Sequence, residues 1–168
     1  TLAEPAELAT AFPGHEHLLR RLEIEHANLV AALTWLDAAG ETETFLRLAG
    51  ALTHFWYAHS HYRTGQFWLE RAVDRASGAA QALRARVLFG LGALVLYQGN
   101  APRARTLMES GLALWRQEGQ TIDVCLALAA LGATDSSLGD YDQASARLDE
   151  GLALIAAEPD SPLQRSVL

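Results

Sequence analysis

The chain has 168 residues, half of them apolar, and a formal net charge of −7, so it can form a domain with a buried core and is not a disordered tail. Its single cysteine, Cys125, excludes an internal disulfide and a cysteine-based zinc site, and it suits a reducing, cytoplasmic setting. No apolar run is long enough to span a bilayer and no stretch has the pattern of a signal peptide, so we expect no membrane partner.

The charge is distributed unevenly along the chain. Residues 1–60 carry eight acidic residues and three Arg, residues 61–120 carry four acidic residues and eight Arg, and residues 121–168 carry eight acidic residues and two Arg. Nucleic-acid binding needs a dominant positive surface, so the two acidic ends argue against direct contact with nucleic acid. The basic middle suits an acidic protein partner or another domain of the same chain.

The first 40 residues are expected to contain one long helix. Two prolines, Pro5 and Pro13, predict a linker or a short helix over residues 1–14. A continuous helix is predicted for residues 15–40, and Gly40 ends it.

Residues 41–158 repeat with a period of about 40. The letters Gly-Leu-Ala-Leu occur at 111–114 and again at 151–154, and small residues and leucines keep this register over two dozen positions. A more worn copy lies upstream. A period between about 20 and 50 residues predicts a solenoid. The three helical hairpins are expected at about 41–78, 80–119 and 120–158.

Local capping signals divide each hairpin into two helices. Gly99 stands where a helix needs a left-handed C-terminal residue, and Asn100 follows as an N-cap with Pro102 in the first turn. Gly139 and Asp140 repeat the same arrangement in the next hairpin.

Small residues mark where the two helices of a hairpin approach each other. Gly92 and Gly132 lie in the middle of helices, where Gly costs roughly 1 kcal/mol relative to Ala. A close neighbouring helix explains this cost. The residues expected on the opposing helix are Ala104, Ala144, Gly111 and Gly151.

The last residues of the chain predict the start of another helix. Ser161 is an expected N-cap, Pro162 suits the first helical position, and Gln164 suits a capping box. We therefore expect residues 159–168 to be the start of a truncated fourth repeat.

The spacing of the small residues resembles the tetratricopeptide repeat. Leu-Gly at 91–92 is followed by Gly99, Ala104 and Gly111. The period here exceeds the family's usual value of about 34, and Asp135 stands where the third unit should have an aromatic residue. The resemblance implies an all-α, right-handed α-solenoid that binds proteins.

The N-terminal half resembles a more specific group. The stretches LEIEHANLVAALTWLDAAG, from Leu22, and FLRLAGALTHFWYAHSHYRTGQFWLERAV, from Phe45, resemble the segment behind the nucleotide-binding module of signal-transduction ATPases with numerous domains (STAND ATPases). LuxR-type and antibiotic-regulatory (SARP-like) activators belong to this group. The family's turn glycine is Ser60 here. The chain has no P-loop pattern, so neither nucleotide chemistry nor DNA binding is assigned to these residues.

The histidines and acidic residues of the N-terminal half permit two further interpretations. His54, His59 and His61 cluster near the first hairpin turn, but their spacing does not favour a metal site over solvated or capping histidines. Glu23, Glu25 and His26 could form an acid–base group, but their spacing on a helix favours a solvated face.

The tryptophans and two arginines are interpreted structurally. The helical spacing of the tryptophans favours core packing over a ligand box; they are Trp35, Trp56, Trp68 and Trp115. Arg71 and Arg75 are expected to be solvated or paired with Glu70 and Asp74.

The expected functional surface is the concave face lined by the first helix of each hairpin. Arginines and aromatic residues, which are enriched at binding hot spots, dominate its first two units. The expected inward residues are Arg47, His54, Tyr57, Arg86, Phe89, Tyr97 and Ser136. They predict a groove for a peptide or helix of acidic and apolar character, or one that neighbouring repeats fill.

The functional hypothesis is a protein-interaction or sensor arm of a multidomain bacterial transcriptional regulator. Its partner would be a protein, a peptide or another domain of its own chain, and it needs no cofactor. The alternative is a free-standing adaptor with no attached ATPase. No constellation of side chains supports an enzyme.

Overall fold

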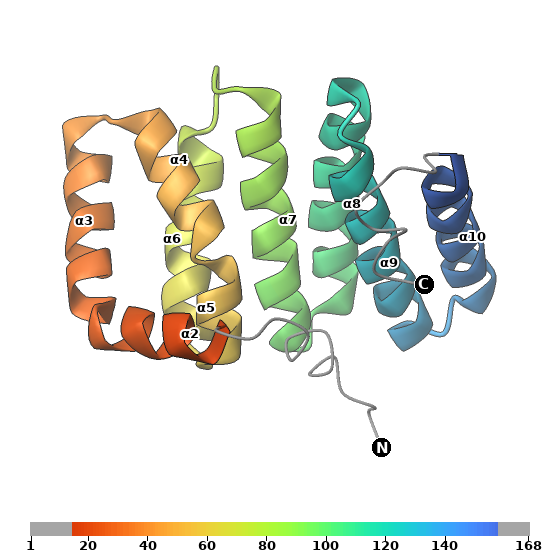
Figure 1. The fold of residues 1–168 in the computed structure, drawn as a ribbon, viewed down its shortest axis with the longest axis horizontal. Coiled ribbons are helices and arrows are strands. Elements are labelled where there is room, and N and C mark those ends of the chain that lie inside the picture. The colour runs from red at the N-terminus through yellow and green to blue at the C-terminus, as the bar shows by residue number, and fades with distance from the viewer. Residues whose placement is uncertain (1–14, 158–168) are drawn as a thin grey trace.

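The computed structural model describes residues 15–157, and every regular element in that range is a helix (Figure 1). The helices are α2 His15–Ile24, α3 His26–Ala39, α4 Thr42–Ala51, α5 Thr53–Ala58, α6 Tyr62–Arg75, α7 Gln81–Tyr97, α8 Ala101–Glu118, α9 Thr121–Ser137 and α10 Tyr141–Ala157. None of these helices is long and apolar enough to cross a membrane. The expected linker at 1–14 and the expected fourth repeat at 159–168 lie outside the described residues.

The helices pack as hairpins that follow one another in chain order. Helix α7 packs on α8 and α9 packs on α10, while α4 and α5 pack on α6. Contacts of α7 with α4 and α6, and of α8 with α9, join each hairpin to the next. Figure 1 shows the row, with α5 in front of α6 and α9 in front of α8. The all-α solenoid expected from the repeat is therefore confirmed.

Left-handed residues close the turns between paired helices. Gly99 has a φ of 85°, and the side chain of Asn100 then accepts a hydrogen bond from the backbone N–H of Arg103 at 3.2 Å. Ser60 has a φ of 59° in the equivalent turn of the first hairpin, although residues other than Gly rarely adopt this conformation. Ser60 thus takes the left-handed turn position that Gly99 and Gly139 occupy in the other two hairpins.

The single helix expected over residues 15–40 is a wrong prediction, because α2 and α3 are separate helices that meet at Glu25. The bend directs α2 across the base of α5 (Figure 1). There the Glu23 carboxylate lies 2.8 Å from His61 Nε2 and 3.1 Å from His59 Nδ1. No Gly or Pro marks the bend, and contacts with residues distant in the sequence hold α2 in this position.

Helices α7 and α8 approach each other closely through their small residues. A Cβ atom added at Gly92 would lie 2.7 Å from Met108 Cγ and 3.0 Å from the carbonyl oxygen of Ala104. A Cβ added at Gly111 would lie 2.9 Å from the carbonyl oxygen of Ala85. Real side chains do not fit in these gaps without moving the backbone.

The third hairpin is packed less tightly at the equivalent positions. A Cβ at Gly132 would lie 3.1 Å from Leu148 Cγ and 3.4 Å from the carbonyl oxygen of Ala144. A Cβ at Gly151 would lie 3.7 Å from Leu128 Cβ, which is an ordinary contact. The repeat register therefore puts small residues at both contacts, but only the α7–α8 contact is close enough to require glycine.

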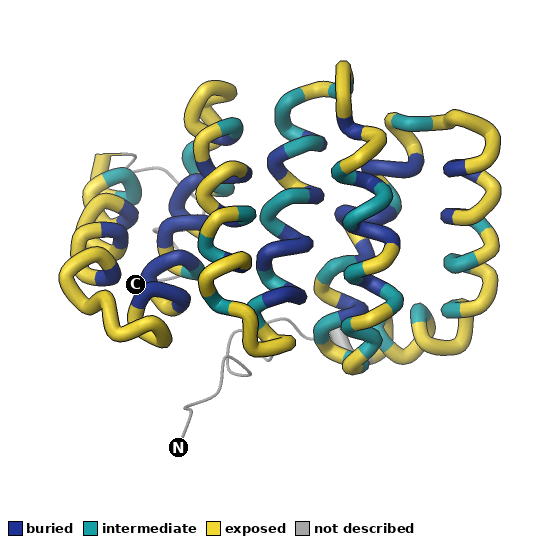
Figure 2. The backbone as a smooth tube through the Cα atoms, turned by 180° about the vertical axis from the view of Figure 1, so that it is seen from behind, coloured by how far each residue is buried: buried dark blue, intermediate teal, exposed yellow. Residues whose placement is uncertain are grey.

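The core consists of two apolar clusters that run along the row of hairpins, as the buried segments in Figure 2 show. Trp56 and Trp68 belong to the first cluster and Trp115 to the second. Trp35 does not follow the core prediction, because 64% of it is exposed. Among the described helices, α3 packs mainly on α4, and its Leu33 is fully buried instead.

The pairing expected for Arg71 and Arg75 is also wrong. Both arginines reach Asp37 of α3, which is buried: Arg71 Nε donates to Asp37 Oδ2 at 2.8 Å, and Arg75 Nη2 lies 3.0 Å from Oδ1. These contacts tie α6 to α3, and they arise because the two helices lie side by side in the fold.

Asp135 occupies the position where the repeat family usually has an aromatic residue, and it is fully buried. Arg147 Nε donates to Asp135 Oδ2 at 2.6 Å, and Arg105 Nη1 lies 3.2 Å from Oδ1. Arg147 also pairs with Glu109. An ion-pair network thus replaces the usual aromatic packing in the third hairpin.

Candidate protein-binding groove

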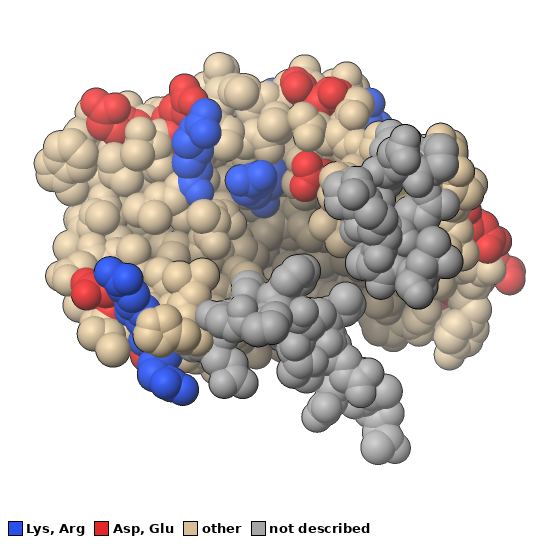
Figure 3. Space-filling model, viewed as in Figure 1, with Lys and Arg blue, Asp and Glu red and all other residues tan. Residues whose placement is uncertain are grey.

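A groove of about 460 Å³ opens on the face formed by α4, α5, α7 and α9. We call it the aromatic groove. Its lining combines aromatic rings, small residues and a few charged or polar side chains: Gly50, Ala51, Thr53, His54, Tyr57, Arg86, Phe89, Gly90, Ala93, Tyr97, Trp115, Asp123 and Leu126. Figure 3 shows this face hollowed in its middle, with charged atoms gathered mainly toward its edges.

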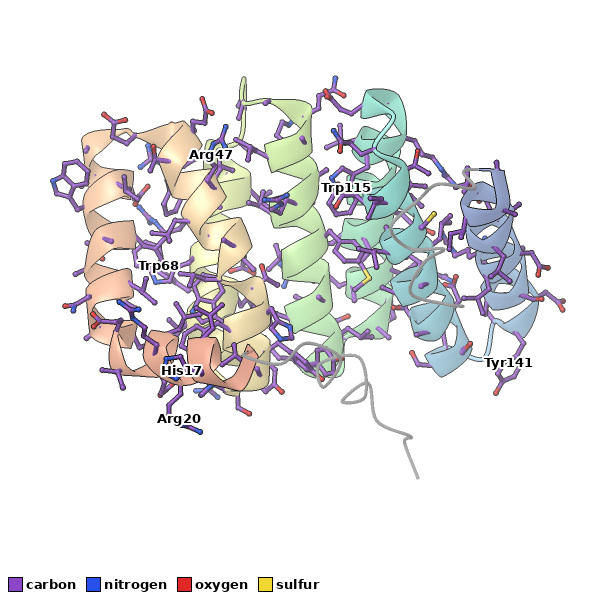
Figure 4. The ribbon with its side chains drawn as sticks, viewed as in Figure 1. His17, Arg20, Arg47, Trp68, Trp115 and Tyr141 are labelled. Carbon is purple, nitrogen blue, oxygen red and sulfur yellow. The ribbon has the colours of Figure 1, made fainter. Side chains whose placement is uncertain are left out.

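The aromatic groove brings together most of the predicted concave residues: His54, Tyr57, Arg86, Phe89 and Tyr97. Arg47 and Ser136 are not part of the lining. Arg47 pairs with Glu43 at 2.7 Å near the upper end of α4 (Figure 4). Ser136 donates its hydroxyl hydrogen to the carbonyl oxygen of Gly132 at 2.9 Å.

Two glycines let α4 and α5 approach α7 and form the floor of the groove. A Cβ added at Gly50 would lie 2.9 Å from Cγ and Cδ of Arg86, so the aliphatic part of Arg86 rests directly on the α4 backbone. A Cβ added at Gly90 would lie 2.5 Å from Thr53 Oγ1. The sequence interpretation missed both glycines. They could have been predicted from their spacing, because Gly50 and Gly90 are forty residues apart, which is the period of the repeat.

Tyrosines form the lower end of the groove. The rings of Tyr57 and Tyr97 lie with centroids 4.3 Å apart, and Tyr62 lies 6.2 Å from Tyr97. Burial, and then hydrogen bonding with Tyr57, raise the pKa of Tyr97 above its ordinary value of 10.0. The phenol of Tyr97 is therefore neutral at physiological pH and can donate a hydrogen bond.

The opposite half of the groove is apolar on its floor and charged on its two walls. Trp115 of α8 fills the space between α7 and α9, with its ring 5.2 Å from that of Phe89 (Figure 4). Arg86 is exposed on the α4–α7 wall and makes no ion pair with any residue in the range 15–157. Asp123 belongs to α9, so it stands on the other wall. The groove can therefore hold an apolar side chain next to a carboxylate.

The histidine and glutamate side chains near the first turn form a structural cluster. Glu23 accepts from both His59 and His61, and the ring of His26 stacks on His61 with centroids 4.2 Å apart. The solvated face expected for Glu23, Glu25 and His26 holds for the two glutamates, which are exposed, although Glu23 also pairs with the histidines. His26 is half-buried, and its Nε2 is buried without a hydrogen-bond partner among the described residues. Within the described residues no three His, Cys, Asp or Glu side chains are placed to hold a metal ion.

Comparison with known proteins agrees with this geometry. Residues 83–157 match the family model of the tetratricopeptide repeat. Candidate HTH-type transcriptional regulators of Mycobacterium bovis and Mycobacterium tuberculosis are 29% identical over 126 residues, which is 70% of this chain and 14% of each relative. The chain therefore spans about one seventh of the length of these curated relatives.

Two solved structures share the fold at low sequence identity. The TPR domain of Arabidopsis FLU superposes with a TM-score of 0.62 at 19% identity, covering 69% of this chain and 98% of that domain. BtubC from P. vanneervenii superposes with a TM-score of 0.66 at 21% identity, covering 96% of this chain and 68% of that protein. Together with the packing of the hairpins, these neighbours show that the described residues form an all-α solenoid with the fold of tetratricopeptide-repeat domains.

Proposed function

We propose that this chain is the protein-interaction arm of a multidomain bacterial transcriptional regulator, and that the aromatic groove is its binding site. The observation that carries the binding site is that one groove brings Arg86, which makes no ion pair within residues 15–157, together with the aromatic rings of Phe89 and Trp115. The regulator context rests on the match to the mycobacterial proteins and on the resemblance of residues 22–73 to STAND-type activators. Such a regulator would act in the cytoplasm.

The groove chemistry favours a ligand segment that presents an aromatic or aliphatic side chain next to a carboxylate. Arg86 offers a planar fork of donors for the carboxylate. Phe89, Trp115 and the tyrosine end offer apolar surface with hydrogen-bonding edges. Asp123 disfavours a second carboxylate against the α9 wall. The ligand is a protein or peptide, or another domain of the same chain.

The groove is tested with short random peptides displayed on phage and selected on the wild-type chain. We expect the selected peptides to pair acidic with aromatic residues, and their affinity is then measured by fluorescence anisotropy. Arg86→Glu should abolish binding and Tyr97→Ala should weaken it. Arg84→Glu, which reverses a charge on the same helix outside the groove lining, is the matched control.

A variant at Gly50 distinguishes the effect of the position of the Arg86 side chain from the effect of its charge. Gly50→Ala keeps every charge but displaces the Arg86 stem that rests on Gly50, so it should weaken the selected peptide while leaving the helical content unchanged. The groove proposal is wrong if the selected peptides bind Arg86→Glu and Tyr97→Ala as tightly as they bind the wild type.

The regulator context is tested by reading the complete open reading frame around this segment. We expect a P-loop ATPase module and a helix-turn-helix in the same frame. A frame that holds only further repeats would contradict the regulator context and would leave a free-standing adaptor.

A further inference from the structure

We infer that residues 1–14 of this chain bind in the aromatic groove in cis and compete there with the external ligand. This inference rests on the proposed function of the groove. The ligand proposed for the groove combines acidic and apolar side chains, and the chain carries such a segment, TLAEPAELATAFPG, directly before α2.

The composition of residues 1–14 complements the groove. Glu4 and Glu7 are the charged side chains of this segment, and both are acidic. Leu8 and Phe12 supply apolar side chains of the kind that the rings of the groove accommodate. Residues 158–168, the other part of the chain outside the structure, contain an arginine and no aromatic residue, so they fit Arg86 and the tyrosines less well.

The segment is attached at the correct end of the groove. Helix α2 begins at His15 and packs against α5, the helix that carries Tyr57. Figure 4 shows His17 at the lower end of the molecule, beside α5. Tyr57 and Tyr97 form the lower end of the groove, so residues 1–14 leave α2 next to the tyrosines.

The separation of Arg86 from Tyr97 along the groove is compatible with the separation of Glu7 from Phe12 in an extended chain. Eleven positions separate Arg86 from Tyr97 on α7, or about 16 Å at the helical rise of about 1.5 Å per residue. An extended chain spans at most about 3.3–3.6 Å per residue, which places Phe12 within about 10 Å of the start of α2 and Glu7 within about 27 Å. The five positions from Glu7 to Phe12 are long enough, when extended, to cover the distance of about 16 Å between Arg86 and the tyrosines.

Occupation in cis lowers the apparent affinity for a ligand in trans, because only the fraction of molecules with an open groove can bind it. Removing the acidic residues of the segment should therefore increase the affinity of the phage-selected peptide. We expect the double variant Glu4→Arg, Glu7→Arg to bind this peptide severalfold more tightly than the wild type.

Contact is measured directly by paramagnetic broadening in the full chain. A nitroxide is attached to Ala9→Cys in a chain that also carries Cys125→Ser. We expect it to broaden the amide signals of Tyr57, Phe89 and Tyr97. Adding Arg86→Glu should remove this broadening, whereas the control Arg84→Glu should retain it.

The remaining outcomes overturn the inference. Cis binding through Arg86 is excluded if the nitroxide broadens no signals in the groove or only signals outside it. It is also excluded if the broadening in the groove persists in the Arg86→Glu variant. Broadening between a spin-labelled chain and a separate isotope-labelled chain shows that a second copy occupies the groove. If the selected peptide still requires Arg86 in these cases, the proposed function stands and only the cis inference fails. If it does not, both fail.

Discussion

Asp135 is a fully buried carboxylate near the C-terminal end of α9. Its charge is balanced by Arg147, itself only 8% exposed, and by the more exposed Arg105. A buried pair of this kind is costly to break, because removal of one partner leaves the other charge in a low-dielectric environment.

Asp135→Ala should lower the free energy of unfolding by about 3 kcal/mol, because Arg147 then lacks its buried partner. Asp140→Asn is the matched control, because Asn removes the charge and keeps the N-cap role expected at this position. Asp140 pairs with the same Arg105 but is exposed, so its loss should cost less than about 1 kcal/mol. Urea denaturation of both variants measures the difference, and equal costs would show that the buried network contributes no more than the surface pair.

His26 shows how burial sets a protonation equilibrium. Burial disfavours the charged imidazolium, and the neighbouring His61 adds to this effect, so the pKa of His26 lies below its ordinary value of 6.5. Glu23 acts in the opposite direction but less strongly. The unfolded chain then binds more protons than the folded chain between the folded pKa and 6.5. The stabilisation is complete above pH 6.5 and is lost as the pH falls through the folded pKa.

The ring protons of His26 should therefore titrate below pH 6.5 when followed by NMR. Glu23→Gln removes the nearby negative charge and should lower the pKa of His26 further. A rise in that variant would show that the carboxylate acts mainly by holding α2 in place rather than by its charge.

At the scale of helices, the two hairpins that match the repeat best are packed differently. The α7–α8 contact brings backbone against backbone, whereas Gly132 in α9 faces the flexible side chain of Leu148. Glycine is therefore required at position 92 in α7, whereas a larger residue can be accommodated at position 132 in α9.

Gly92→Ala should be destabilising, because its methyl group would lie 3.0 Å from a carbonyl oxygen that belongs to the helix backbone. Gly132→Ala should be neutral or stabilising, because Leu148 can adjust and Ala favours a helix by roughly 1 kcal/mol over Gly. Thermal unfolding of the two variants tests this ordering. Equal effects would show that the α7–α8 contact can expand at no cost.

At the scale of the whole molecule, each hairpin is stabilised by its neighbours. Helix α7 contacts α4, α5, α6 and α8, whereas α2 contacts α3 and α5, and α10 packs on α9. Helix α10 leaves much of the apolar side chains of Leu148 and Leu152 exposed. In a solenoid, stability is the sum of repeat and interface contributions, so the ends open before the middle.

Amide hydrogen exchange should therefore be slowest in α7 and fastest in α2 and α10 among the described helices. Mass spectrometry of peptic fragments measures this order. A uniform exchange rate across α2, α7 and α10 would show that the segment unfolds as one cooperative unit instead.

The sequence by itself determined the period, the hairpins and the turns, because these depend on local chemistry. Gly99 and Asn100 end one helix and begin the next through their own backbone and side-chain preferences. Helical periodicity within a repeat register also placed Tyr57, Arg86 and Tyr97 on one face, where the groove lies.

The contacts between segments that are distant in the sequence depend on tertiary packing. Beyond the bend at Glu25, α2 is held by the contacts of Glu23 with His59 and His61, and the arginines of α6 reach back to Asp37. Trp35 is exposed because α3 packs mainly on α4 among the described helices. Each of these features depends on which surfaces meet after the hairpins stack. A local pattern of residues does not predict such contacts between distant segments.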